Sequence, residues 1–166
     1  FWKSYDEKDT RRDATFLEYY TKKNKEGFGC VMQKAIGSIN SNNNRIYDTD
    51  FIVYRYADAL LMMAEVENGL GNPCAGYINE VRKRAGIDEV KDLSYGDFQK
   101  LIRDERGREL CFESLRKYDL VRWGIYYKAI KEDLGAAVND ARWSTANNAK
   151  GAAQYVSNTT EKNQFL

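Results

Sequence analysis

The sequence predicts a mainly α-helical fold with long irregular loops. Apolar residues recur at helical spacing over about 51–134, in segments separated by turn residues. Residues 1–50 show no sustained period, and 135–166 consist largely of Ala, Asn, Gly, Ser and Thr. Short extended pieces are expected around 15–20 and 29–34. We therefore expect one helical core between loop-rich ends.

The first expected helix lies within 54–72, "YRYADALLMMAEVENGLGN". The charges of Arg55, Asp58 and Glu65 exclude a membrane span, which needs about twenty largely uncharged apolar residues. Arg55 and Asp58 are three residues apart and are expected to form an ion pair on the helix surface. One face of this helix carries the apolar residues Ala57, Leu60, Leu61 and Ala64.

Further helices follow at short intervals. The second is expected over 74–85, "CAGYINEVRKRA", and ends at Gly86. Ser94 begins the third, with Asp97 three residues later in an approximate capping box. The segment "YDLVRWGIYYKAIKEDLG" predicts one or two more helices that end near Gly135, with little regular structure after it.

The first two helices are joined by the tight turn at Asn72-Pro73, so they are expected to be antiparallel. Alanines at helical spacing, with a Gly between the two helices, resemble a tetratricopeptide unit. One such pair cannot bury its own apolar face. It must therefore pack on the third helix or on chain outside this sequence.

Composition excludes several classes of site. The 166 residues suffice for one domain. The sequence has 26 Lys and Arg against 25 Asp and Glu, and the resulting net charge of +1 does not favour binding to nucleic acid. The sequence has no His, which excludes Ser-His-Asp triads and His-ligated zinc. Three scattered cysteines form no metal or disulfide motif and are expected to be buried free thiols. No metal and no cofactor is expected.

The third helix places carboxylates on its apolar face. Phe98, Leu101 and Ile102 begin this face, and Glu105 and Glu109 occupy its next positions. A buried carboxylate needs a charged partner, and Arg is suited because its planar guanidinium binds a carboxylate at two points. Candidate partners are Arg55, Arg82, Arg106, Arg108, Arg116 and Arg122. We expect a structural charged network of Arg55, Asp58, Glu105, Glu109, Arg116 and Arg122.

The alternative for Glu105 and Glu109 is a glycosidase-like pair of catalytic acids. Such acids more often come from separate elements that flank a cleft, whereas these two are neighbours on one helix. The surrounding arginines should keep both ionised, and a general acid needs a raised pKa. We therefore expect a structural role and no catalysis.

The motifs of this sequence resemble those of the SusD/RagB family of cell-surface nutrient-binding proteins. "DTRRDATF" resembles the family's upstream "D.R...TF" segment, and Ser114 stands where members usually have Gly. The resemblance spans 9–124. Its motifs are Arg55-Tyr56-Ala57-Asp58, Leu60-Leu61-Met62, Ala64-Glu65, Ile78-Asn79, Val81-Arg82, Arg84-Ala85-Gly86, Glu105-Arg106, Glu109-Leu110, Phe112-Glu113, Arg116, Asp119-Leu120 and Arg122-Trp123-Gly124.

The resemblance implies a SusD-like fold with tetratricopeptide-like helix pairs, and a chain that is the C-terminal part of a larger protein. It implies a non-catalytic protein on the outer face of a Gram-negative outer membrane, held by an N-terminal lipid anchor absent from this chain. Its partners would be a glycan ligand and a SusC-like TonB-dependent transporter that imports the glycan. The alternatives are a peptide- or protein-binding member of the family and a helical protein-interaction module.

Aromatic residues are the candidates for sugar contact, because a flat ring covers the apolar face of a sugar. The rings of Tyr54, Tyr56 and Trp123 are expected to fill the core. A binding platform instead needs exposed rings on loops. This criterion selects Trp2, Tyr5 and Trp143, with the competing interpretation that these rings hold loose segments onto the helices.

Overall fold

The computed structural model describes residues 4–20, 28–34, 49–138 and 149–160, and the chain divides into two compact units. The first unit, Phe1–Ser114, contains α1 Thr10–Thr15, β1 Phe16–Tyr20, β2 Phe28–Met32, α2 Tyr56–Leu70, α3 Ala75–Arg84 and α4 Tyr95–Glu109. The second, Leu115–Leu166, contains α5 Arg116–Arg122, α6 Tyr126–Ala129, the π-helix η2 Ile130–Leu134, α7 Gly135–Val138 and α9 Ala149–Asn158. The mainly helical class is confirmed.

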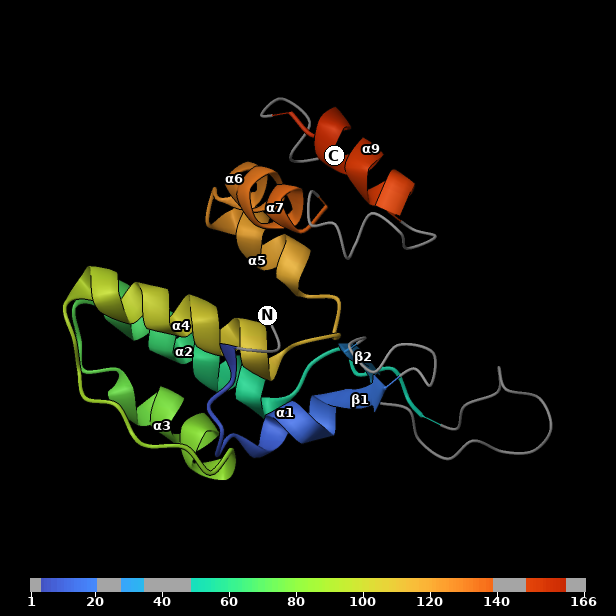
Figure 1. Ribbon diagram of the computed structural model, residues 1–166. Helices are drawn as coiled ribbons and strands as arrows, with labels where there is room; N and C mark the ends of the chain where they lie inside the picture. Colours follow the sequence, from blue (N-terminus) through green and yellow to red (C-terminus); the bar gives the residue numbers. More distant parts are fainter. Residues whose placement is uncertain (1–3, 21–27, 35–48, 139–148, 161–166) are drawn as a thin grey trace. The chain divides into compact units, whose positions relative to one another are not determined.

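Helices α2, α3 and α4 form the core of the first unit. Both α3 and α4 pack against α2, and α2 and α4 lie side by side in Figure 1. The apolar face expected within 54–72 is confirmed, because all four of its residues are buried. The centre of this core, drawn from all three helices, is Leu61, Ala64, Ile78, Val81, Phe98 and Ile102.

Side chains from outside a helix hold its ends in place. The backbone N–H groups of Cys74 and Ala75 donate to Asp92 Oδ1 at 2.9 and 2.8 Å, which satisfies the free donors at the start of α3. Asn79 donates to the carbonyl of Val90 at 2.8 Å and accepts from its N–H at 2.9 Å. The loop after α3 is thereby tied to that helix. Ser94 caps α4, as the sequence predicts.

The N-terminal segment packs on the end of α3. The extended pieces expected near 15–20 and 29–34 form an antiparallel pair, β1 and β2, in which Phe16 lies opposite Met32. Helix α1 was not expected, because six residues are too few to show an apolar period. The N–H and hydroxyl of Thr10 both donate to the carbonyl of Ala85 at 3.1 Å. This contact places α1 against the turn at Gly86.

The second unit corrects the expectation of loop after Gly135. Helix α9 occupies Ala149–Asn158 and contacts α7 and η2. Its sequence, "AKGAAQYVSN", contains three alanines, which have the highest helix propensity, and they outweigh the Asn and Ser that suggested loop. The side chain of Lys131 donates to the carbonyl of Val156 at 2.5 Å. The hydroxyls of Tyr126 and Tyr155 form a hydrogen bond.

The expectation that three aromatic rings fill the core is wrong for two of them. Tyr54 and Tyr56 are 78% and 70% exposed, and the hydroxyl of Tyr56 donates to Glu80 Oε2 of α3 at 3.3 Å at the surface. Trp123 is half-buried, with the Arg122 guanidinium stacked over its ring. Of the cysteines, Cys74 is buried and Cys111 is half-buried, and both are free thiols. Among the described residues, no helix is long and apolar enough to cross a bilayer.

Candidate functional site

Of the three candidate sugar-binding rings, the structure describes Tyr5. Its side chain is 6% exposed, its hydroxyl donates to the Arg108 carbonyl at 2.8 Å, and its ring meets Phe16 edge-on at 5.8 Å. Burial raises the pKa of its phenol. Tyr5 therefore lacks the exposure that a sugar platform needs, and it has the contacts of a packing residue. Trp2 and Trp143 lie outside the described residues.

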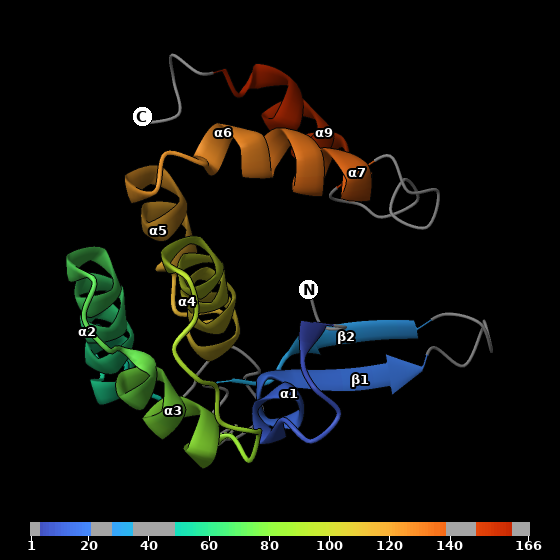
Figure 2. The ribbon, with the colours of Figure 1, turned by 90° about the vertical axis from the view of Figure 1, so that its left-hand side faces the viewer.

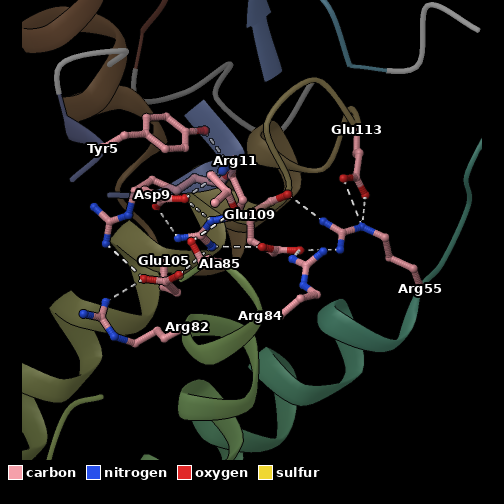
Figure 3. A network of polar contacts seen from close by, with 12 residues as sticks. Tyr5, Asp9, Arg11, Arg55, Arg82, Arg84, Ala85, Glu105, Glu109 and Glu113 are labelled. Atoms are coloured by element: carbon pink, nitrogen blue, oxygen red, sulfur yellow. Dashed lines mark hydrogen bonds and ion pairs between the residues drawn. The ribbon is translucent and has the colours of Figure 1, made fainter. Parts of the chain in front are cut away.

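Glu105 and Glu109 are buried at 0% and 2% exposure, as their place on the apolar face of α4 predicts (Figure 3). Arg11 donates through Nη1 to both, at 2.6 Å to Glu105 Oε1 and 2.9 Å to Glu109 Oε2. The other edge of the same guanidinium donates to Asp9, through Nε at 2.8 Å and through Nη2 at 2.6 Å. Arg11 therefore joins three carboxylates.

Arginines from α3 and α4 complete the pairing of Glu105. Arg82 and Arg108 both donate to its Oε2, at 3.1 and 3.2 Å. Arg82 also donates to the carbonyl of Asp88 at 2.7 Å. Both oxygens of this fully buried carboxylate are thus hydrogen-bonded, as a charge in a protein core requires.

Cationic side chains from outside α4 pair with Glu109 and Glu113. Arg55 donates to Glu109 Oε1, and its Nε lies 2.8 Å from Glu113 Oε2. Arg84 also donates to Glu109 Oε1. Lys34 donates to the backbone carbonyl of Glu109 at 2.7 Å and forms an ion pair with Glu113 at 2.5 Å. The chain after β2 and the chain before α2 are both held by the end of α4.

These cations determine the ionisation of the carboxylates. Burial alone would raise the pKa of Glu109, but hydrogen bonds from Arg11 and Arg55 outweigh it and hold that pKa below its usual range. Burial likewise opposes the shift at Glu113, where hydrogen bonds from Arg55 and Lys34 lower the pKa. Glu109 therefore stays ionised at neutral pH and is unsuited to the role of a general acid.

The arrangement supports a structural network, with corrections to its members. Asp58 does not pair with Arg55 across one turn of α2. It forms an ion pair with Arg106 at 2.8 Å, and both side chains are 4% exposed. Arg116 and Arg122 belong to the second unit, where Arg122 binds Asp119 at 3.0 Å and Arg116 lies over the Trp123 ring. Sequence reasoning did not identify Lys34, Asp9, Arg11, Arg84 and Glu113 as members of the network.

The turn after α4 has an unusual backbone. Phe112 and Ser114 have φ values of 65° and 63°, in the left-handed region that favours Gly. Glu113 lies between them and points its carboxylate at Arg55 (Figure 3). Phe112 is 49% exposed, and it follows the end of α4 at Glu109. In this left-handed conformation Gly, the residue that the family resemblance leads us to expect at position 114, would be unstrained.

A shallow hollow of about 300 Å³ lies beside this network, between α2 and α3. Ala57, Leu60 and Val81 form its apolar side. The polar lining residues are Arg55, Tyr56, Glu80 and Arg84. Among the described residues, no group of three or more Cys, Asp or Glu side chains is placed to bind a metal ion.

Comparison with known proteins identifies the family. The profile described as "SusD family" matches residues 22–165. The chain belongs to the SusD family. SusD-like protein P25 of Formosa agariphila is 42% identical over 99 residues, which cover 56% of this chain and 18% of that protein. The starch-binding protein SusD of Bacteroides thetaiotaomicron is 40% identical over 79 residues, which cover 48% of this chain and 14% of that protein.

Solved structures of SusD-family proteins share the fold. A SusD homologue from Bacteroides thetaiotaomicron superposes with a TM-score of 0.67 at 26% identity, over 93% of this chain and 36% of that one. A SusD superfamily protein from Bacteroides fragilis gives a TM-score of 0.63 at 33% identity, over 72% of this chain and 27% of that one. The chain therefore spans a minor part of the length of its relatives. The described helices share the mainly helical, tetratricopeptide-like fold of these SusD-superfamily structures.

Proposed function

We propose that this chain is part of a non-catalytic protein that binds oligo- or polysaccharides at the cell surface for uptake through a SusC-like TonB-dependent transporter. The observation that carries the proposal is its 40% identity over 79 residues to a protein named for starch binding. By the same family resemblance, the protein would lie on the outer face of the outer membrane. The buried charged network supports the non-catalytic part, since Glu109 is fully paired and ionised.

The charged network would serve binding indirectly. It ties residues before β1, after β2 and before α2 to a single helix end. Loops with fixed ends can hold a binding surface in place at a lower entropic cost than free loops. Trp2 and Trp143 remain the proposed contact residues for sugar, because each lies in a polar segment without an apolar period. Tyr5 is not proposed as a sugar contact, because its side chain is buried.

Binding can be tested with the longer polypeptide that carries this chain, by isothermal titration with starch and a panel of other glycans. We expect saturable binding to at least one glycan. The Trp143→Ala and Trp2→Ala variants should weaken binding about fivefold or more, since truncation of a Trp that anchors a ligand typically costs more than about 1 kcal/mol. Their melting temperatures should stay within a degree or two of the wild type.

Two controls separate binding from structure and from catalysis. Tyr5→Phe removes the buried hydroxyl that donates to Arg108 and should lower stability without changing affinity. Release of reducing ends from the bound glycan by the wild-type protein, abolished in Glu105→Gln, would contradict the non-catalytic assignment. Absence of binding to every glycan, with binding to peptides, would favour the peptide-binding alternative.

A further inference from the structure

A second hollow, of about 320 Å³, lies in the first unit where α2 ends and α4 begins. Its walls come from the turn between α2 and α3 and from the loop that leads into α4. In Figure 1 these two segments lie at the left-hand end of the helices, and Figure 2 looks onto that end. The charged network lies at the other end, because Arg55 precedes α2 and Glu109 ends α4. The polar residues of this hollow therefore need an explanation of their own.

Asn68 brings an unused hydrogen-bond acceptor to this hollow. It continues the apolar face of α2, four residues after Ala64, and it is 6% exposed. Its side-chain Nδ2 donates to the carbonyl of Tyr95 at 3.2 Å and to Gln99 Oε1 at 3.3 Å. Among the described residues, none donates to its Oδ1. Because buried amide oxygens normally have a partner, this oxygen favours a ligand that donates a hydrogen bond to it.

Asp92 supplies a second acceptor. The N–H groups of Cys74 and Ala75 both donate to its Oδ1, so its Oδ2 accepts from neither. These backbone hydrogen bonds, that of Cys74 most, lower the pKa of Asp92, and the carboxylate is ionised at neutral pH. An ionised carboxylate accepts hydrogen bonds and donates none. Two acceptors on one hollow suit a ligand with several donors, such as the hydroxyls of a sugar.

An exposed aromatic ring borders the same hollow. Tyr95 is 63% exposed, and Leu93 in the loop before it is 52% exposed. The backbone of Tyr95 is held in place, because its carbonyl accepts from Asn68 and Ser94 caps the helix directly before it. A ring on a fixed backbone can cover the apolar face of a sugar at a low entropic cost. The hollow thus combines a ring with hydrogen-bond acceptors.

The lining also limits the kind of sugar. Among the described residues that line the hollow, Asp92 carries the only charge, so an anionic sugar would meet a carboxylate without a compensating cation. The volume lies at the lower end of the roughly 300–1,000 Å³ of small-molecule sites, which suits a single sugar unit. We propose that this hollow binds one neutral sugar unit, with Tyr95 against the sugar ring and Asn68 Oδ1 and Asp92 Oδ2 as acceptors for its hydroxyls. The class of ligand rests on the proposed function.

Isothermal titration of the longer polypeptide that carries this chain would test the site. The probes are neutral hexasaccharides of glucose, mannose and xylose, and hexagalacturonate as the anionic probe. We expect wild-type protein to bind at least one neutral hexasaccharide. Tyr95→Ala should weaken that binding about fivefold or more, the effect typical of a ring that anchors a ligand. Tyr95→Phe should retain most of the affinity, because it keeps the ring. The affinity for hexagalacturonate should be equal in wild type and Tyr95→Ala.

Two matched controls separate this site from general effects. Tyr56 is 70% exposed at the other end of α2, so Tyr56→Ala removes a similar ring and should leave the affinity unchanged. Asn68→Ala should weaken binding and lower the melting temperature, since it removes the acceptor and both hydrogen bonds of the amide. Gln99→Ala removes one partner of the same amide and should lower the melting temperature without changing affinity.

The outcomes distinguish this site from the proposed function. If wild-type protein binds a neutral hexasaccharide and Tyr95→Ala or Asn68→Ala binds it equally well, the hollow is not a sugar site, and the proposed function stands. If wild-type protein binds no glycan, both proposals fail. Equal losses in Tyr95→Ala and Tyr56→Ala would contradict a contact specific to this hollow. A loss of hexagalacturonate binding in Tyr95→Ala as large as the loss for the neutral probe would contradict selection for neutral sugars.

Discussion

Arg11 is the residue on which the buried charges of the first unit converge. It contacts Asp9, Glu105 and Glu109. Burial lowers its pKa, but the hydrogen bonds that it donates to Asp9 and both glutamates outweigh burial and raise that pKa. The sequence indicated the carboxylates, because Glu105 and Glu109 occupy apolar positions of a clear helical face. It did not indicate Arg11 as a partner, since the two ends of that contact are 94 residues apart. The spacing of residues along one helix gives no information about contacts between residues so far apart in the sequence.

The first prediction concerns Glu109. Glu109→Gln should lower the free energy of unfolding by about 3–5 kcal/mol, because the surrounding arginines stay buried and charged when one partner is lost. Urea unfolding followed by circular dichroism would measure the change.

Asp13→Asn is the matched control. Asp13 pairs with Arg12 at 3.0 Å, but its side chain is 78% exposed, so its loss should change stability by less than about 1 kcal/mol. Equal effects of the two substitutions would show that the network does not stabilise the fold.

At the scale of elements, sequence reasoning succeeded where a segment carries its own period or cap. The face of α2 and the Ser94 cap of α4 are examples, and both were confirmed. It failed where contacts across the chain decide the outcome. Helix α1 is short and rests against Ala85. Helix α9 was missed for a local reason, since its alanines outweigh the Asn and Ser that suggested loop. The exposed rings of Tyr54 and Tyr56 were misassigned because aromatic residues signal burial only on average.

The second prediction uses two glycines near α3. Gly86 has a φ of 74°, which residues with a Cβ rarely adopt, so Gly86→Ala should cost about 1–2 kcal/mol although the added Cβ would make only ordinary contact with its neighbours. Gly76 lies within α3 with open space around it, so Gly76→Ala should raise stability by up to about 1 kcal/mol. Thermal unfolding of both variants provides the measurement. A change of the same sign in both would contradict the role given to the left-handed turn.

At the scale of the molecule, the carboxylates that stabilise the first unit make its stability depend on pH. The pKa values of Glu109 and Glu113 are both lowered from the ordinary 4.5. Below that value, the unfolded chain binds protons that the folded chain does not. The stabilisation is therefore fully present above about pH 5, and it is lost as the pH falls through 4.5 toward the lowered values.

The third prediction is this acid dependence. The free energy of unfolding should be nearly constant from pH 6 to 7 and should fall steadily below about pH 4.5. Urea titrations at fixed ionic strength would measure it. The double variant Glu109→Gln/Glu113→Gln should be less stable at pH 7 but flatter below pH 4.5. A double variant that keeps the wild-type slope would assign the acid sensitivity to other carboxylates.

The span of the network along the chain has a consequence for how the protein folds. Arg11 meets Glu109 across 98 residues of sequence, whereas α2 and α3 are joined by a four-residue turn. Contacts between distant residues require a large loop to close first, which slows their formation relative to local packing. Helices α2 to α4 can therefore associate before the N-terminal segment arrives. Arg11 would then bind the end of α4 late in folding, and loss of that contact should accelerate unfolding far more than it slows folding.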